Sequence, residues 1–271
     1  MLLLVATLNT AVAAKTLTVE ETREIEAPVA LVWSVVSNYQ TWKDWTVWNP
    51  EKDPEATWTY EGKAGEVGHS TEWAGPRLGK GKMVSTRAVA NTSWQYDLYF
   101  NGKDKSYPGG LTLHESNGTT TVAWSFNMKM GGLGAVLFGK KISKMIAADF
   151  AGGLENLEEQ VEAAHAAARL EAAEGEVAVG SATVEAAKVA LAEAQTTASA
   201  AAASKAAAES ALSAARGRSK QVAAQAELDA AASALDAAED AKKAAEEALA
   251  TATIALEAAQ AAVEKLKSPR K

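Results

Sequence analysis

The stretch GGLGAVLFGKKISKMIAADFAGGLENLEEQV, residues 131–161, decides how this chain folds, because a long apolar stripe runs through it. The members of the stripe follow one another at spacings of three and four: Ile142, Ile146, Phe150, Leu154, Leu157 and Val161, with Met145 beside them. That period is typical of a helix with one apolar face. Such a face predicts a second layer of structure that the helix covers.

The composition changes at the end of this stretch. All eight Trp, all five Tyr and all four Phe lie at or before Phe150, and Ala, Glu, Lys, Ser and Leu dominate afterwards. A chain of 271 residues can hold one domain or two, and this change favours two. We expect a domain over residues 15–163 and an alanine-rich helical extension over residues 164–271, with a separate short segment over residues 1–14.

The segment 1–14, MLLLVATLNTAVAA, is apolar and contains Ala11-Val12-Ala13, the small-x-small pattern of a signal-peptidase site. No basic side chain precedes the apolar run, which is shorter than the roughly 20 residues of a membrane span. A short signal peptide or anchor and an ordinary buried strand both remain open. The pattern favours an exported, periplasmic or membrane-anchored protein over a cytoplasmic one, with membrane or envelope contact through the N-terminus.

Strand patterns fill most of the chain before the stripe. Residues 15–26 alternate as a strand does, Pro28 opens a short amphipathic helix, and Trp42, Trp45 and Trp48 follow in a segment that we interpret as a loop. Six further strand patterns are separated by Gly, Asn or Pro turns: ATWTYEG, HSTEWAG, KGKMVSTRAV, TSWQYDLYF, PGGLTLHES and TTTVAWSFNMK. The sequence therefore predicts a seven-stranded antiparallel sheet.

Two of these strands show that one face of the sheet is apolar. Their apolar residues alternate with polar ones and are Trp94, Tyr96, Leu98 and Phe100 in one strand and Val122, Trp124, Phe126 and Met128 in the other. The stripe is the one element long enough to cover this face. We therefore expect an α+β fold, a helix-grip arrangement in which the sheet grips a long C-terminal helix.

The elements carry, in order, residues that resemble a known family. These are Glu26-Ala27-Pro28, Val32-Trp33, the Trp42–Trp48 segment with Asn49-Pro50 and Asp53-Pro54, Gly68, Trp73, Gly79 and Gly81 in a turn, Lys144-Met145-Ile146, Asp149-Phe150, Gly153-Leu154 and Leu157. Over about residues 17–162 their order resembles the SRPBCC superfamily, and more narrowly its polyketide cyclase/dehydrase-like branch with the START and Bet v 1 type fold. The resemblance implies a cavity between sheet and helix for a lipid, sterol, polyketide or aromatic molecule.

Large apolar side chains around that expected cavity are candidates for its wall. They are Trp45, Trp48, Trp73, Tyr96, Trp124, Phe126, Met145, Ile146 and Phe150. Aromatic residues at strand spacing also form ordinary cores, so both interpretations stay open for each of them. The leading function is binding or transport of a hydrophobic small molecule. The alternatives are a cyclase- or dehydratase-type enzyme on the same fold, and a structural or oligomerising protein that acts through the helical extension.

Candidate catalytic groups are few. The chain has no Cys, and its three histidines, His69, His114 and His165, are each expected at the surface. No cluster has metal-ligand spacing, and no Gly-x-Ser-x-Gly occurs. We predict no catalytic residue, metal or cofactor. The net charge of −7 includes no basic patch of the kind that nucleic-acid binders show, so we predict no nucleic-acid partner.

The extension after residue 163 is rich in strong helix formers and lacks proline before Pro269. Heptad spacing relates Leu228, Leu235, Leu249, Leu256 and Val263, and alanines fill a companion seam. The turn signal Arg216-Gly217-Arg218 predicts an antiparallel helical hairpin, and Gly175 and Gly180 are expected to bend its first helix. A loosely paired spacer and a self-associating coiled coil both remain open.

Overall fold

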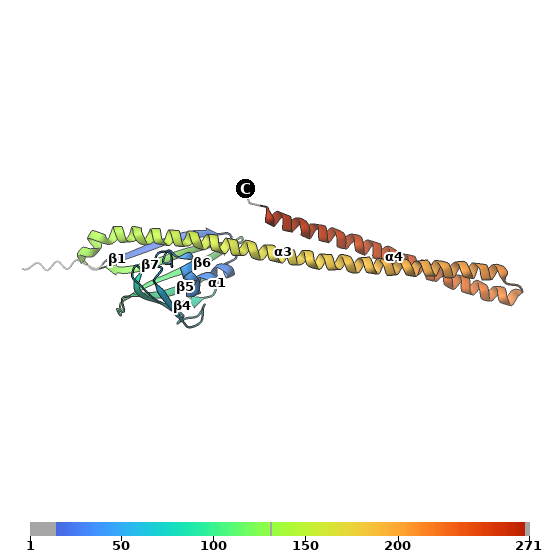
Figure 1. Cartoon of the computed structure of the whole chain (residues 1–271), viewed down its shortest axis with the longest axis horizontal. Coiled ribbons are helices and arrows are strands. Elements are labelled where there is room, and N and C mark those ends of the chain that lie inside the picture. Colours follow the sequence, from blue (N-terminus) through green and yellow to red (C-terminus); the bar gives the residue numbers. More distant parts are fainter. Residues whose placement is uncertain (1–14, 131, 269–271) are drawn as a thin grey trace, which may run out of the picture. The chain divides into compact units, whose positions relative to one another are not determined.

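The computed structural model describes residues 15–130 and 132–268, with side chains over residues 16–129 and 138–268. The signal peptide or anchor predicted for residues 1–14 lies outside the described residues. The chain divides into two compact units, the first ending at His165 and the second beginning at Ala166. We call them the head and the arm and describe each by itself (Figure 1).

The head contains a seven-stranded antiparallel sheet in the order β1-β7-β6-β5-β4-β3-β2. Its strands are β1 Lys15–Ile25, β2 Thr57–Glu61, β3 Ser70–Gly75, β4 Gly79–Val89, β5 Ser93–Phe100, β6 Ser106–Ser116 and β7 Thr119–Met130. Six strands follow one another as a meander, and β1 pairs along its whole length with β7. The predicted α+β fold is confirmed.

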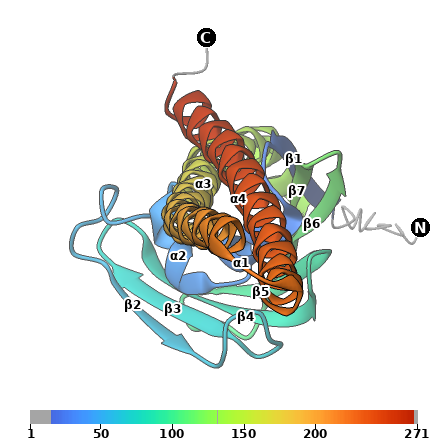
Figure 2. The same cartoon turned by 90° about the vertical axis from the view of Figure 1, so that its right-hand side faces the viewer.

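Two short helices, α1 Val29–Val36 and α2 Tyr39–Trp45, connect β1 to β2. Figure 2 shows both on the concave side of the curved sheet. The first helix begins directly after Pro28, as predicted. The second replaces the expected loop, because the Asn38 side chain caps it by accepting a 3.1 Å hydrogen bond from the Gln40 N–H. Trp42 and Trp45, three residues apart, then share one buried helix face.

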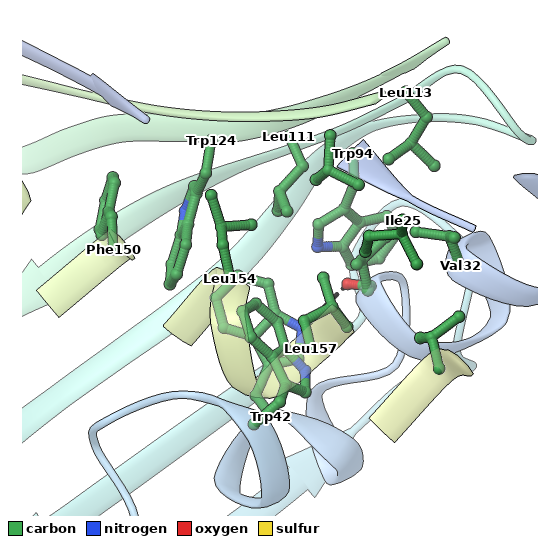
Figure 3. Packing of buried hydrophobic residues seen from close by; sticks show 14 of the residues in the cluster. Ile25, Val32, Trp42, Trp94, Leu111, Leu113, Trp124, Phe150, Leu154 and Leu157 are labelled. Carbon is green, nitrogen blue, oxygen red and sulfur yellow. Dashed lines mark hydrogen bonds between the residues drawn. The ribbon is translucent and has the colours of Figure 1, made fainter. Parts of the chain in front are cut away.

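The helix α3, Gly132–Ala214, carries the stripe that covers the sheet. Phe150, Leu154, Leu157 and Val161 are each at most 2% exposed, whereas Ile146 is only half-buried. Figure 3 shows Leu154 and Leu157 packed among the aromatic rings of the core. The second half of the stripe therefore belongs to the core, and the first half is left for another role.

Polar contacts fix this part of α3 on the head. Arg23 on β1 forms a salt bridge with Glu158, whose carboxylate it also contacts through Nε. The Asn156 Nδ2 group donates a 3.0 Å hydrogen bond to the carbonyl oxygen of Trp45, at the end of α2. Since these bonds reach both β1 and α2, they set the register of the helix against both of its neighbours.

The arm is a hairpin of two helices, the remainder of α3 and α4 Arg218–Lys267. The chain reverses between the two helices at Gly217, as the turn signal predicted. The φ of 90° at this residue is a conformation that favours glycine. In α4 the predicted Leu and Ala positions from Leu228 to Val263 are buried or half-buried. Lys267 and Glu174 form a 3.0 Å ion pair between the two helices. The predicted antiparallel hairpin is confirmed.

The two glycines of the first arm helix differ in what surrounds them. Neither interrupts α3, which stays helical through both. A Cβ built on Gly175 would meet nothing within 4 Å, whereas one on Gly180 would lie 3.3 Å from Cδ1 and 3.5 Å from Cα of Leu256. Gly180 therefore lets the two helices approach closely, a packing role in place of the bend that we expected there.

Candidate functional site

A cavity of about 390 Å³ lies in the head between the concave face of the sheet, α2 and the first part of α3. The apolar residues of its lining are Trp42, Trp48, Trp58, Trp73, Leu78, Met83, Leu98, Phe100, Phe126, Met128, Ile142, Met145, Ile146 and Phe150. The polar ones are Tyr39, Lys43, Thr46, Tyr60, Thr71, Tyr96 and Asp149. Sites for small molecules span about 300–1,000 Å³ and have this mainly apolar character.

Two glycines inside strands make room for aromatic rings of the lining. Gly81 on β4 pairs directly with Trp73, and Gly109 on β6 pairs directly with Tyr96. A Cβ on Gly81 would collide with the Trp73 indole, and one on Gly109 would lie 2.6 Å from Cζ of Tyr96. The expected turn at Gly79 and Gly81 is instead the first part of β4, where the missing side chain admits the indole.

The structure brings most of the predicted wall residues to this cavity. Those on its lining are Trp48, Trp73, Tyr96, Phe126, Met145, Ile146 and Phe150. Met145 lies at the open side, since 58% of its surface is exposed. Trp45 and Trp124 are not on the lining: both are fully buried in the core, with ring centroids 5.2 Å apart.

The aromatic core supports the cavity from behind. The Trp124 ring stacks on Phe150 with centroids 3.9 Å apart and an interplanar angle of 4° (Figure 3). The Trp124 Nε1 group donates a 2.9 Å hydrogen bond to the hydroxyl of Tyr96. A Cβ on Gly153 would lie 3.1 Å from the Trp124 ring, so glycine in α3 allows the helix to approach it. The lining residues Phe150 and Tyr96 are thus held by a fully packed tryptophan.

Four lining residues carry a buried hydroxyl group. Tyr39, Tyr96, Thr46 and Thr71 are 1%, 2%, 2% and 4% exposed. Burial raises the pKa of both tyrosines well above the ordinary value near 10, so both phenols stay protonated and can donate hydrogen bonds at neutral pH. The hydroxyls of Tyr39 and Thr71 make no hydrogen bond within the described part of the chain.

His69 is a buried structural residue, which corrects the expected surface position. It is 2% exposed and stacks on the Tyr39 ring at 4.9 Å. Its Nε2 accepts a 3.1 Å hydrogen bond from the Tyr39 N–H, and its Nδ1 lies 2.9 Å from the Glu61 carbonyl oxygen. These two bonds fit the neutral tautomer with the proton on Nδ1. His69 therefore ties the start of α2 to the sheet, while His114 is exposed as predicted.

A buried carboxylate shapes the rim of the cavity at Leu78. Asp53 is 1% exposed, and its Oδ2 accepts hydrogen bonds from the Arg77 and Leu78 N–H groups at 2.8 and 2.9 Å. Burial alone would raise the pKa of Asp53, but the N–H groups of Leu78, Arg77 and Glu55 outweigh burial and lower it below its ordinary value. Asp53 thus holds the turn between β3 and β4 in the charged form.

The substitution Asp53→Asn is expected to lower the melting temperature of the head at pH 7. A carboxyl whose pKa is lower in the folded state stabilises the fold above its unfolded pKa, near 3.9, and this stabilisation is lost as the pH falls through the folded value. The difference from the wild type should therefore close below about pH 4. Tryptophan fluorescence melts between pH 7 and 2.5 measure it. Asp104→Asn, at an exposed turn residue, serves as the control and should show no such pH-dependent gap.

Within the described ranges, no three His, Asp or Glu side chains gather as a metal would require. Nor does any helix among the described residues combine the length and apolar character needed to cross a bilayer.

Several lining residues were missed because they lie in elements that were misread or were not singled out. Tyr39 lies in helix α2, which the sequence did not predict, so the direction of the Tyr39 side chain could not be predicted either. Side chains two residues apart in a strand point to the same face of the sheet. Leu98 and Phe100 therefore share a face with Tyr96 on β5, and Thr71 shares one with Trp73 on β3, so this alternation could have identified all three as lining residues.

Solved structures of other proteins match a little more than half of this chain. No curated protein matches the sequence. Solved structures that match include a Staphylococcus aureus protein of unknown function, 10% identical with a TM-score of 0.47, covering 56% of this chain and 96% of that chain. Another is protein Ms6760 from Mycobacterium smegmatis, which is 16% identical with a TM-score of 0.40; the match covers 57% of this chain and 99% of that chain. A third is the Aha1 dimer from Colwellia psychrerythraea, which is 14% identical with a TM-score of 0.41; the match covers 54% of this chain and 96% of that chain.

The sequence model of a family described as "Polyketide cyclase / dehydrase and lipid transport" matches residues 16–162, more than half of the chain. These residues include the whole lining of the cavity and every strand of the sheet, apart from Lys15, the first residue of β1. The SRPBCC resemblance predicted from the order of the elements is confirmed, and the chain belongs to the polyketide cyclase/dehydrase and lipid transport family.

Proposed function

We propose that the head binds or transports a hydrophobic small molecule, a lipid, sterol, polyketide or aromatic compound, in the cavity between the sheet and α3. The observation that carries this proposal is a cavity of about 390 Å³ with a lining dominated by aromatic and aliphatic side chains. Family membership supports ligand binding at the family level. Apolar surface that a ligand buries there contributes about 25 cal/mol per Å².

The packing around the cavity supports binding rather than an incompletely filled core. Trp124, directly behind the lining, is in close stacking contact with the lining residue Phe150, so the aromatic layer that supports the cavity is itself densely packed. An apolar cavity without contents costs stability because its lining lacks contacts. A molecule that fills the cavity should therefore raise the melting temperature in proportion to the logarithm of its concentration above Kd.

The test uses the purified full-length chain and a naphthalene-based apolar probe, whose binding is followed by energy transfer from the tryptophans of the head. Leu98→Trp places a large ring in the cavity and is expected to weaken probe binding at least about tenfold, a change of roughly 1.4 kcal/mol. The matched control is Tyr99→Trp, the next residue on β5, which is not on the lining. Equal probe binding by both variants, or no binding by the wild type, would contradict the proposal.

Self-association through the arm and membrane contact through residues 1–14 are separate predictions. Light scattering of the full-length chain over a range of concentrations tests the first, and a monomer mass throughout would contradict it. Flotation with lipid vesicles, comparing the full-length chain with one lacking residues 1–14, tests the second.

A further inference from the structure

We propose that the early part of α3, over residues 138–148, is a surface that docks on an anionic lipid bilayer and places the open side of the cavity against it. This inference rests on the proposed function and names the partner from which the head takes up its hydrophobic ligand or to which it delivers it. Its basis is a strip of apolar side chains that runs from the lining to the surface, with three lysines beside it on the same helix.

The apolar strip consists of Phe138, Ile142 and Met145, which spacings of four and three residues place on one face of α3. Phe138 is 57% and Met145 58% exposed, although large apolar side chains are usually buried. Ile142 and Met145 also line the cavity, so the strip continues its apolar lining onto the surface of the head. Adjoining exposed apolar side chains of this kind mark interaction sites. The partner of this surface therefore offers an apolar environment.

Three lysines give the same surface a positive charge. Lys140, Lys141 and Lys144 are exposed, and none of them forms an ion pair with another described residue. Lys141 lies three residues after the first member of the strip and four before the last, and such positions are neighbours on a helix surface. From residue 116 to residue 148 the chain has four lysines and no acidic residue, whereas the whole chain has a net charge of −7. The positive charge is therefore local, and it complements an anionic surface.

An anionic bilayer matches both the apolar strip and the lysines. Exposed apolar side chains enter the boundary between head groups and acyl chains, while neighbouring lysines are attracted to anionic head groups. The proposed ligand favours the same partner, because a hydrophobic molecule partitions from water into a bilayer. With the strip in the bilayer, such a molecule would pass Met145 and enter the cavity without crossing water.

The test measures binding of the full-length chain to two kinds of vesicle by flotation: phosphatidylcholine alone, and phosphatidylcholine with about one third phosphatidylserine. Residues 1–14 contain no charged side chain, so contact through them contributes equally to both. The wild type is expected to bind the anionic vesicles about tenfold or more tightly, although its net charge alone would weaken this binding. The combined substitutions Lys140→Glu, Lys141→Glu and Lys144→Glu should abolish the preference.

Matched controls separate this surface from net charge and from apolar exposure in general. The substitutions Lys220→Glu, Lys243→Glu and Lys265→Glu, at exposed positions of α4, together change the net charge by the same amount and should keep most of the preference. Phe138→Ser should weaken binding to both vesicles about three- to tenfold. Val67→Ser, at a 63% exposed residue between β2 and β3, should leave binding unchanged.

Probe binding distinguishes failure of this inference from failure of the proposed function. None of the three lysines is on the lining, so their combined variant should bind the apolar probe in buffer with the wild-type Kd but take it up more slowly from anionic vesicles. Equal binding of the wild type to both vesicles, an equal loss of preference in the α4 variant, or Phe138→Ser binding as Val67→Ser does, would each overturn the docking surface and leave the cavity as a binding site. A wild type that binds anionic vesicles but no probe would instead overturn the proposed function.

Discussion

Replacing Trp124 by alanine is expected to lower the free energy of unfolding of the head by about 3–5 kcal/mol, the range for large aromatic residues in cores. Its indole is fully buried, stacks on Phe150 and meets Trp42 and Trp45 at centroid distances of 5.6 and 5.2 Å. Alanine would leave a hole among rings that cannot all move to fill it, and Tyr96 would lose a donor. Urea unfolding followed by tryptophan fluorescence measures the change, because every tryptophan of the chain precedes residue 151.

Trp58→Ala is the matched control for this substitution. Trp58 is half-buried on β2, at the edge of the sheet, and lines the cavity. Its removal should cost clearly less, at most about 1.5 kcal/mol, because much of its surface already meets solvent. An equal decrease in the free energy of unfolding for Trp124→Ala and Trp58→Ala would show that burial of Trp124 in the aromatic core adds nothing to the stability of the head.

The substitution Gly109→Ala is expected to destabilise the head by about 1–3 kcal/mol and to weaken binding of an apolar probe. The added Cβ would lie 2.6 Å from both Cζ and the hydroxyl oxygen of Tyr96, closer than any ordinary contact. The ring must then move away from β6, into the space of the cavity or off its hydrogen bond with Trp124. Urea unfolding and a probe titration on the same preparation measure both effects.

Gly139→Ala in α3 controls for the added methyl group. A Cβ there would meet nothing within 4 Å, and alanine favours a helix over glycine by up to about 1 kcal/mol. Stability of this variant should therefore stay unchanged or rise. A Gly109→Ala protein as stable as the wild type would mean that the Tyr96 ring has room to shift, and that Gly109 does not fix the wall.

The fold could be predicted because its signals are local and repeat. Period two in β5 and β7 fixed which face of the sheet is apolar, and the three-four spacing from Ile142 to Val161 fixed the covering helix. The extent of the cavity could not be predicted in this way. Whether Phe150 belongs to core or lining depends on where α3 crosses the sheet, and that depends on long-range contacts such as Arg23 with Glu158.

The errors have physical causes as well. The aromatic segment around Trp42 was interpreted as a loop because prolines follow it, yet an asparagine cap and a short apolar face were enough for α2. His69 resembles a surface residue in sequence, and only tertiary structure brings the Tyr39 N–H to its ring. A glycine such as Gly81 is compatible with both a turn and a strand, so the local sequence does not distinguish the two. That Gly81 makes room for the Trp73 indole follows only from the pairing of β3 with β4.

The position of β2 at the end of the strand order has a consequence for how the cavity opens. This strand has five residues and pairs on one side only, with β3. Edge segments of this kind open locally at a small fraction of the free energy of global unfolding. Trp58 and Tyr60, which line the cavity, belong to it. Amide protons of β2 should therefore exchange with solvent well before those of β6 and β7, so that the outermost wall fluctuates while the wall that Phe126 of β7 forms stays closed.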